Sequence, residues 1–146
     1  MTVHQMPRCD LARASAFATQ GVTLKYPGVS WSGVRSEDGM VVFAIHAADV
    51  RFADWGASSI LWSPQTAAAQ ATPRAGSEER LEHCRLALRH GVAEGFLVRG
   101  SETLFFQPEV LALRVVSVGE RYWARWGAVA RAHGPRNRAW LDEACA

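Results

Sequence analysis

The sequence predicts one α+β domain, in which a mainly antiparallel, curved and barrel-like sheet packs against one main helix over about residues 77–90. Three observations support this prediction. The apolar stretches are short and are joined by tight turns, which is typical of antiparallel sheets. One stretch combines long helical periodicity with signals at both of its ends. The chain has 146 residues, of which 49% are hydrophobic, enough to bury one core without cross-links.

The first half of the single domain (1–146) predicts a short helix followed by strands, with residues 1–8 frayed and 65–76 a mobile surface loop. Asp10 is placed to cap a helix over 11–19, because its carboxylate accepts free backbone N–H groups. Alternating or continuous apolar character predicts strands over 22–26, 29–34, 40–45 and 59–63. The strand over 40–45 is apolar at every position, so we expect it in the middle of the sheet.

The second half contains the main helix and the clearest hairpin. Ser77 is placed to cap the helix, and Gly91 is the expected first residue after it. Leu81, Cys84 and Leu88 form an apolar stripe at helical spacing. Further elements are expected as strands over 93–98 and 102–106, a hairpin over 110–126 that turns at Gly119-Glu120, and a short terminal helix over 136–144.

The cationic side chains are almost all arginine, with 15 Arg against the single Lys25 and a net charge of +2. Such a bias is typical either of a GC-rich genome or of forked contacts with phosphate or carboxylate. The three cysteines have no C-x-x-C spacing, which argues against a disulfide framework or a zinc knuckle. The chain shows no signal-peptide core and no stretch approaching 18 apolar residues. We therefore expect a cytoplasmic protein without a membrane span.

A basic, aromatic segment lies between Arg114 and Arg138. It holds six arginines against the single acid Glu120, a local charge of +5 (six minus one). Interleaved aromatic and cationic residues are typical of proteins that bind a phosphate backbone, although a solvated face of an arginine-rich protein has the same pattern. Strand alternation puts Trp123 and Trp126 on opposite faces, so only one of them can belong to the core.

The leading hypothesis is a non-enzymatic binding module for nucleic acid, including a single-stranded, extruded or modified base, that uses Trp/Tyr stacking and Arg–phosphate contacts. The predicted binding residues are Trp31, Arg35, Trp55, Tyr122, Trp123 and Arg125. We predict no catalytic residue, no metal site and no cofactor. Any of these indoles could instead belong to the core, since tryptophan buries a large area.

Two alternative functions stay open. In a small enzyme, His46 with Asp49, or His83 with Glu79, would act as a general base and its orienting acid. The chain lacks the H-E-x-x-H, G-x-S-x-G, Walker and G-x-G-x-x-G motifs, so we favour a protein that is not an enzyme. In a structural or interaction protein, exposed Trp rings would close a homodimer.

Three stretches together carry a resemblance: Trp31-Ser-Gly-Val34, Glu79-Arg-Leu-Glu-His83 and Gly119-Glu-Arg-Tyr-Trp123. Over about residues 29–127 the chain resembles a group of small bacterial proteins with a W-x-G start, an E-R-x-x-H helix and a terminal Y-W strand. Some members look similar to accessory domains fused to, or encoded beside, nucleases. No activity is implied for particular residues.

A second likeness concerns the segment Ser30-Trp-Ser-Gly-Val-Arg35. It is similar to the W-x-G-V-R stretch of EVE-type domains in the PUA-like superfamily, which read modified bases. This resemblance implies a PUA-like barrel and a base-binding role. The residues after Arg35 depart from the EVE pattern, and no functional residue carries over.

Overall fold

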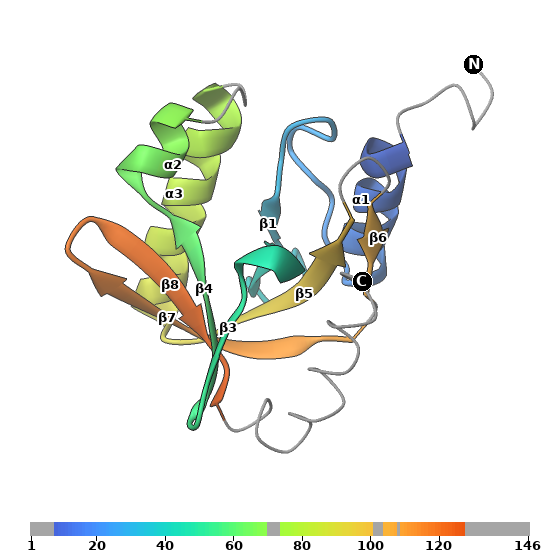
Figure 1. The fold of residues 1–146 in the computed structure, drawn as a ribbon. Coiled ribbons are helices and arrows are strands. Elements are labelled where there is room, and N and C mark those ends of the chain that lie inside the picture. The colour runs from blue at the N-terminus through green and yellow to red at the C-terminus, as the bar shows by residue number, and fades with distance from the viewer. Residues whose placement is uncertain (1–7, 70–73, 101–103, 108, 128–146) are drawn as a thin grey trace.

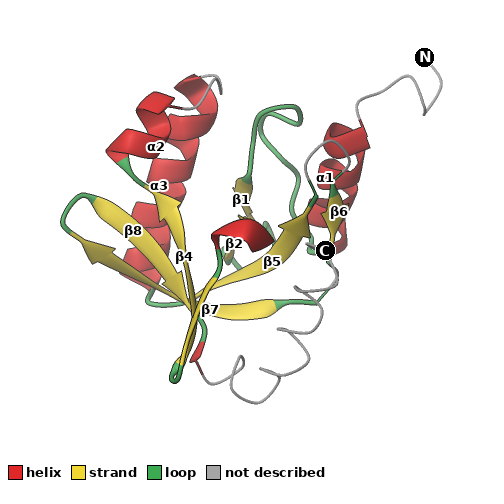
Figure 2. Ribbon diagram, viewed as in Figure 1, coloured by secondary structure: helices red, strands yellow, loops and turns green. Residues whose placement is uncertain are grey.

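An eight-stranded mixed sheet forms the centre of the molecule, with helices on two sides of it (Figures 1 and 2). The computed structural model describes residues 8–69, 74–100, 104–107 and 109–127. Their elements in chain order are α1 (Arg8–Thr19), β1 (Ser32–Val34), β2 (Val41–His46), a 3₁₀ helix (Ala47–Asp49), β3 (Arg51–Ala53), β4 (Gly56–Trp62), α2 (Pro64–Ala69), α3 (Arg74–His90), β5 (Ala93–Arg99), β6 (Phe105–Phe106), β7 (Leu111–Val118) and β8 (Arg121–Arg125).

The strands follow the order β1-β2-β5-β7-β8-β4-β3, and β6 pairs with β5 outside this path. All pairings are antiparallel in the described chain, apart from the parallel pair β2–β5. The intervening β3, β4 and α3 separate these two strands in the chain, as a parallel connection requires. The prediction of an α+β fold with a mainly antiparallel sheet is confirmed.

Two apolar cores lie on opposite faces of this sheet. The larger core joins the buried Cys84 and Ala87 of α3 to inward-facing residues of β2, β5, β7, β8 and β4. The smaller core packs Phe17 of α1 against the other face of β2 and β5, with Phe17 and Phe96 in edge-to-face contact at 4.9 Å. Strand β2 is therefore buried on both faces, as its continuous apolar character predicts, although it is second in the strand order rather than in the middle of the sheet.

The predicted hairpin is β7–β8, and its turn contains Gly119 with a φ of +61°. Leu111, Leu113 and Val115 of β7 are buried, while the residues between them are exposed. Trp126, directly after β8, is also buried in the larger core. The hairpin thus has one core face and one outer face, as its alternation predicts.

The sheet is not closed into a barrel, unlike the predicted barrel-like form. Strands β2 and β4 do not pair with each other in the described chain. The guanidinium group of Arg80, on α3, bridges the gap between them by donating to the carbonyl oxygens of Ala44 on β2 and Leu61 on β4. We call this gap the seam.

Several boundaries differ from the predictions. Residues 22–26 alternate between buried and exposed, but they form no strand, because their buried side chains Val22 and Leu24 pack into the smaller core without a strand partner. The predicted loop over 65–76 is helical at both ends, in α2 and at the start of α3. Helix α3 therefore begins at Arg74, and Ser77 is not its N-cap. Of the residues predicted to be frayed, 1–8, Arg8 instead begins α1. Residues 1–7 and the terminal helix predicted over 136–144 lie outside the described residues.

Candidate functional site

The two sequence stretches W-x-G and E-R-x-x-H meet in the structure. Ser30 Oγ donates a 2.6 Å hydrogen bond to Glu79 Oε1. One turn further along α3, His83 Nδ1 and Ser32 Oγ share a hydrogen bond of 2.7 Å. Both serines are buried. These contacts fasten the segment that enters β1 to one face of α3.

Arg80 lies between these two contacts on the same helix. Its Nε donates to the Leu61 carbonyl at 2.8 Å, Nη1 to the Trp31 carbonyl at 2.7 Å, and Nη2 to the Ala44 carbonyl at 3.2 Å. Burial lowers the pKa of Arg80 from its usual value. No carboxylate of the described chain forms an ion pair with it. Backbone carbonyls are thus its direct partners, and they hold three separate segments together at the seam.

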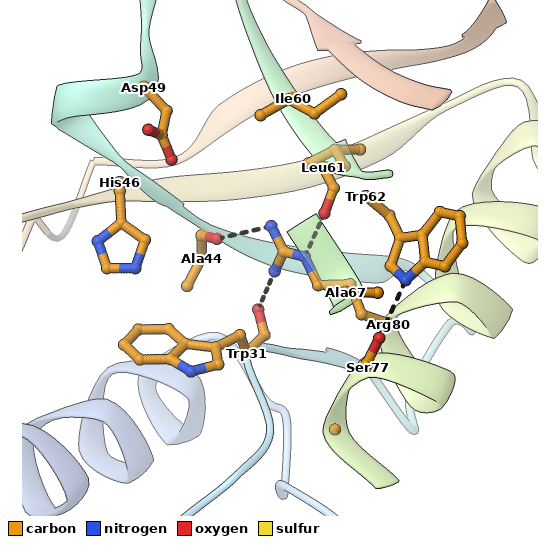
Figure 3. A pocket seen from close by; sticks show the side chains of 11 residues that line it. Trp31, Ala44, His46, Asp49, Ile60, Leu61, Trp62, Ala67, Ser77 and Arg80 are labelled. Atoms are coloured by element: carbon orange, nitrogen blue, oxygen red, sulfur yellow. Dashed lines mark hydrogen bonds between the residues drawn. The ribbon is translucent and has the colours of Figure 1, made fainter. Parts of the chain in front are cut away.

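A cavity of about 110 Å³ opens at the seam beside Arg80 (Figure 3). Its lining includes the indoles of Trp31 and Trp62, together with His46, Asp49, Ser77 and Arg80. The Arg80 guanidinium lies between the two indole groups, and His46 and Asp49 lie on the Trp31 side. The seam therefore combines aromatic walls with cationic, neutral and anionic polar groups.

Trp31 contacts two neighbouring side chains, Arg13 and His46. The Arg13 guanidinium carbon lies 4.1 Å from the centre of its ring, a cation–π contact. The His46 ring lies 5.0 Å away, tilted by 49°. Arg13 is itself almost fully buried. Trp31 therefore presents an aromatic surface to the cavity.

His46 is a neutral polar group of the cavity. Burial lowers its pKa, and the positive charges of Arg80 and Arg13 lower it further, while Asp49 opposes the shift. A neutral imidazole offers one hydrogen-bond donor and one acceptor. On the opposite wall, Trp62 Nε1 donates to Ser77 Oγ at 3.3 Å. Ser77 remains able to donate its own hydroxyl proton.

A second candidate site lies on the outer face of the sheet, across β7, β8, β4 and β3. Arg114 on β7 stands directly opposite Arg125 on β8. Arg125 is opposite Ser58 on β4, and Ser58 is opposite Arg51 on β3. Directly opposed residues share one face of a sheet, and all three arginines are exposed. We call this set, Arg51, Arg114 and Arg125, the arginine row.

Two indole rings accompany the arginine row. The Arg51 guanidinium carbon lies 5.8 Å from the ring centre of Trp123, which is half-buried on the same outer face. The corresponding distance from Arg125 to Trp55 is 5.5 Å. Trp55, in the turn between β3 and β4, is 41% exposed. The outer face thus alternates cationic groups with flat rings.

The six predicted binding residues fall into four places. Trp55, Trp123 and Arg125 come together on the outer face, whereas Trp31 lines the cavity at the seam. Tyr122 is half-buried and packs against the larger core. The structure does not join these groups into one surface.

Arg35 is engaged by the protein's own groups. It forms ion pairs with Glu94 and with Asp38, and its Nε donates to the Gln20 carbonyl at 2.7 Å. Hydrogen bonding to Glu94 raises the pKa of Arg35, with Asp38 adding to the effect. Its forked donors hold the β1–β2 loop and β5 together. The nearby Trp31 in the sequence gives no indication that Arg35 forms these ion pairs.

Three important residues escaped the sequence prediction. Arg114 belongs to the predicted basic segment and lies opposite Arg125 in the predicted hairpin, although it is not among the predicted binding residues. Arg51 joins the row only through the β3–β4 and β4–β8 registers, which the sequence does not reveal. Arg80 had a usable signal: it precedes the buried Cys84 and Ala87 by four and seven residues, which puts all three on one helix face. A charged residue on the apolar face of the main helix is a candidate for a special role.

The two candidate pairs of a histidine base and an orienting acid differ in their surroundings. His46 and Asp49 line the same cavity. Glu79 and His83, by contrast, are bound to Ser30 and Ser32, so they serve to hold β1 rather than each other.

No cysteine or metal chemistry accompanies either histidine in the described chain. Burial raises the pKa of the Cys84 thiol to about 12, which leaves it unreactive at neutral pH. No cluster of three or more His, Cys, Asp or Glu residues suited to a metal ion occurs among the residues described.

No family model, curated protein or solved structure matches this chain. Among the described helices, none has the length and apolar character needed to cross a membrane. Function must therefore be inferred from the two candidate sites themselves.

Proposed function

We propose that this protein is a binding module for single-stranded nucleic acid, and that the strand crosses the outer face along the arginine row. The observation that carries the proposal is the register that aligns Arg114, Arg125 and Arg51 across four strands. Each guanidinium group offers forked donors to a phosphate. The row therefore matches a partner with repeated negative charge.

The cost of the row supports this proposal. Like charges placed directly opposite each other destabilise a sheet, and Arg114 and Arg125 are such a pair. None of the three row arginines has a carboxylate within ion-pair distance in the part of the chain that is described. A polyanion that binds there would remove the repulsion and release its own counterions.

The rings beside the row favour a single strand over a duplex. Trp55 is exposed at a turn, and Trp123 is half-exposed on the outer face. Bases stack on such rings only when they are not stacked within a duplex, and each stacked base contributes about 1–3 kcal/mol. Alternation of rings and guanidinium groups is the arrangement that a flexible strand can follow.

A polarisation titration with labelled 12-nucleotide single-stranded and duplex DNA tests this proposal at low salt. We expect the wild type to prefer the single strand. The triple variant Arg51→Gln, Arg114→Gln, Arg125→Gln should lose most of its affinity, because each substitution removes one phosphate contact.

The matched control is Arg85→Gln, which removes the same charge from an exposed position on α3, the helix that packs on the opposite face of the sheet. It should bind as the wild type does. The proposal is wrong if the wild type binds no oligonucleotide at low salt, or if the triple variant binds as tightly as Arg85→Gln.

The cavity supports a second candidate, a small enzyme with His46 as general base. Neutral His46 and the carboxylate of Asp49 line one cavity, which is the composition of a base and its orienting acid. Incubation with labelled single-stranded RNA and DNA, followed by gel analysis, tests for cleavage. Products that appear with wild type and not with His46→Gln would favour the enzyme over the binding module.

A homodimer remains a further prediction, since exposed Trp55 could contact a second copy. Sedimentation at high protein concentration distinguishes the two states. A monomer would leave the ring available for bases.

A further inference from the structure

The cavity at the seam has features that the arginine row does not explain. Its two indoles offer apolar contact to a flat group: Trp31, which is in cation–π contact with Arg13, and Trp62, which is hydrogen-bonded to Ser77. Both rings lie beside Arg80 rather than over it (Figure 3). The walls suit a flat, apolar-faced ligand, because aromatic rings stack on one another.

The polar lining suits a ligand with both donors and acceptors. Arg80 supplies donors, Asp49 supplies acceptors, and His46 and Ser77 each supply one of either kind. An anion would meet the carboxylate of Asp49, and a cation would meet the guanidinium of Arg80. A neutral ligand with mixed hydrogen-bonding edges fits this set better than either ion.

Size restricts the ligand further. Pockets for larger small molecules measure about 300–1,000 Å³, whereas this cavity measures about 110 Å³. It has room for several water-sized groups, each of which needs about 10–15 Å³. One ring fits, and a nucleotide with its phosphate does not.

We propose that this cavity binds one uncharged, planar heteroaromatic ring with the chemistry of a nucleobase. The ring lies against the Trp31 and Trp62 indoles, and its edge is bound by His46, Ser77 and Arg80. Such a ring has two sources: a free base or nucleoside, and an unstacked base of a bound strand. The second source rests on the proposed function, whereas the first does not.

The position of the cavity makes the second source possible. Ile60 lines the cavity and stands opposite Trp123 in the β4–β8 register. Ser58, two residues earlier on β4, belongs to the cross-strand line that connects the arginines of the row. A strand held along the row therefore passes close to the cavity, at a distance of a few residues along β4.

Titration calorimetry of the full chain with uridine, cytidine, adenosine and guanosine tests the site directly. Ribose 5-phosphate serves as the probe that lacks a base. We expect at least one nucleoside to bind and ribose 5-phosphate not to bind. If none of the four nucleosides binds, the proposal is overturned.

Two variants locate the binding. Ala67→Leu adds a larger side chain from α2 to the cavity lining and should weaken nucleoside binding about tenfold or more, the equivalent of one lost stacking contact. Ala112→Leu adds the same side chain at an exposed position of β7 and should change nothing. Circular dichroism confirms that both variants are folded. Nucleoside binding that Ala67→Leu leaves unchanged also overturns the proposal.

A third comparison separates this inference from the proposed function. The wild type and Ala67→Leu are titrated with a 12-nucleotide single strand and with the same strand carrying abasic residues throughout. If the cavity takes a base from the strand, Ala67→Leu weakens binding of the first and leaves the second unchanged. If only free nucleosides respond, the ligand is a small molecule. If the wild type binds nucleosides but no oligonucleotide, the proposed function is wrong and the proposal of a cavity site stands.

Discussion

Arg80 at the seam and the exposed arginine row use the same side chain in opposite ways. Arg80 donates to three backbone carbonyls and spans the seam between β2 and β4. The row arginines stand in line on the outer face, where no described carboxylate pairs with them. Three N–H groups of Arg80 satisfy the protein's own acceptors, whereas the row arginines would offer theirs to the proposed partner. This difference predicts opposite effects on stability and on binding.

The largest expected effect comes from Arg80→Met. Methionine fills a similar volume but leaves the Leu61 and Ala44 carbonyls without their donor. Each buried unsatisfied polar group costs about 1–3 kcal/mol, so the free energy of unfolding should fall by about 3 kcal/mol. Urea unfolding followed by tryptophan fluorescence measures this change.

Arg85→Met is the matched control, because Arg85 is exposed on the same helix. Its free energy of unfolding should change by less than about 0.5 kcal/mol. Equal stability of the two variants would show that Arg80 does not hold the seam.

His83 makes the attachment of β1 dependent on pH. Burial lowers the pKa of His83 to about 4, from an ordinary value near 6.5. Because the folded state disfavours protonation, stability is complete above pH 6.5 and declines as the pH falls from 6.5 towards 4. The lowered pKa of His46 acts in the same direction. Melting temperatures recorded between pH 7.5 and 4 should therefore decrease.

His83→Asn should flatten this dependence, since an amide can bond Ser32 without titrating. The exposed His90 provides the control His90→Asn, which should follow the wild-type curve. The same decline in all three proteins would contradict the role assigned to His83.

The sequence predicted the hairpin and the fully buried strand β2 correctly, because both depend on local patterns. The glycine turn and alternation of β7–β8 and the continuous apolar run of β2 need no distant partner to be recognised. The prediction of a strand over 22–26 was wrong, because a strand also needs a distant pairing partner. Its alternation is real, but burial of Val22 and Leu24 against α1 produces it without a ladder.

The candidate sites were less predictable, because they depend on contacts between distant segments. Trp55, Trp123 and Arg125 were expected together and do share the outer face. Arg51 joins that face only through the β3–β4 and β4–β8 registers, which join distant parts of the chain. Leu88 was predicted to lie on the apolar face of the main helix, but it is 39% exposed. Arg80, in contrast, lies on the buried face of that helix. Helix spacing places Arg80 on that face, but its carbonyl partners at the seam come from distant segments, which no local pattern contains.

The arginine row should show the salt dependence of phosphate contacts, and the cavity should not. For single strands, the logarithm of the binding constant changes with the logarithm of salt concentration by about −0.7 per phosphate contact. Three contacts predict a slope of about −2, and Arg125→Gln should reduce its magnitude by about 0.7. Nucleoside binding should keep a slope near zero. Equal slopes for the two ligands would place both at one site.

The smallest expected effect is a gain in stability from the row itself. Arg114→Gln removes one member of the opposed pair Arg114–Arg125, and cross-strand charge pairs are worth about 0.2–1 kcal/mol. Both groups are exposed, so the increase in the free energy of unfolding should be near the lower limit at low salt and should disappear at high salt. Urea unfolding at two salt concentrations measures it. The sign is opposite to that of Arg80→Met, and a loss of stability in Arg114→Gln would show that the row also serves the fold.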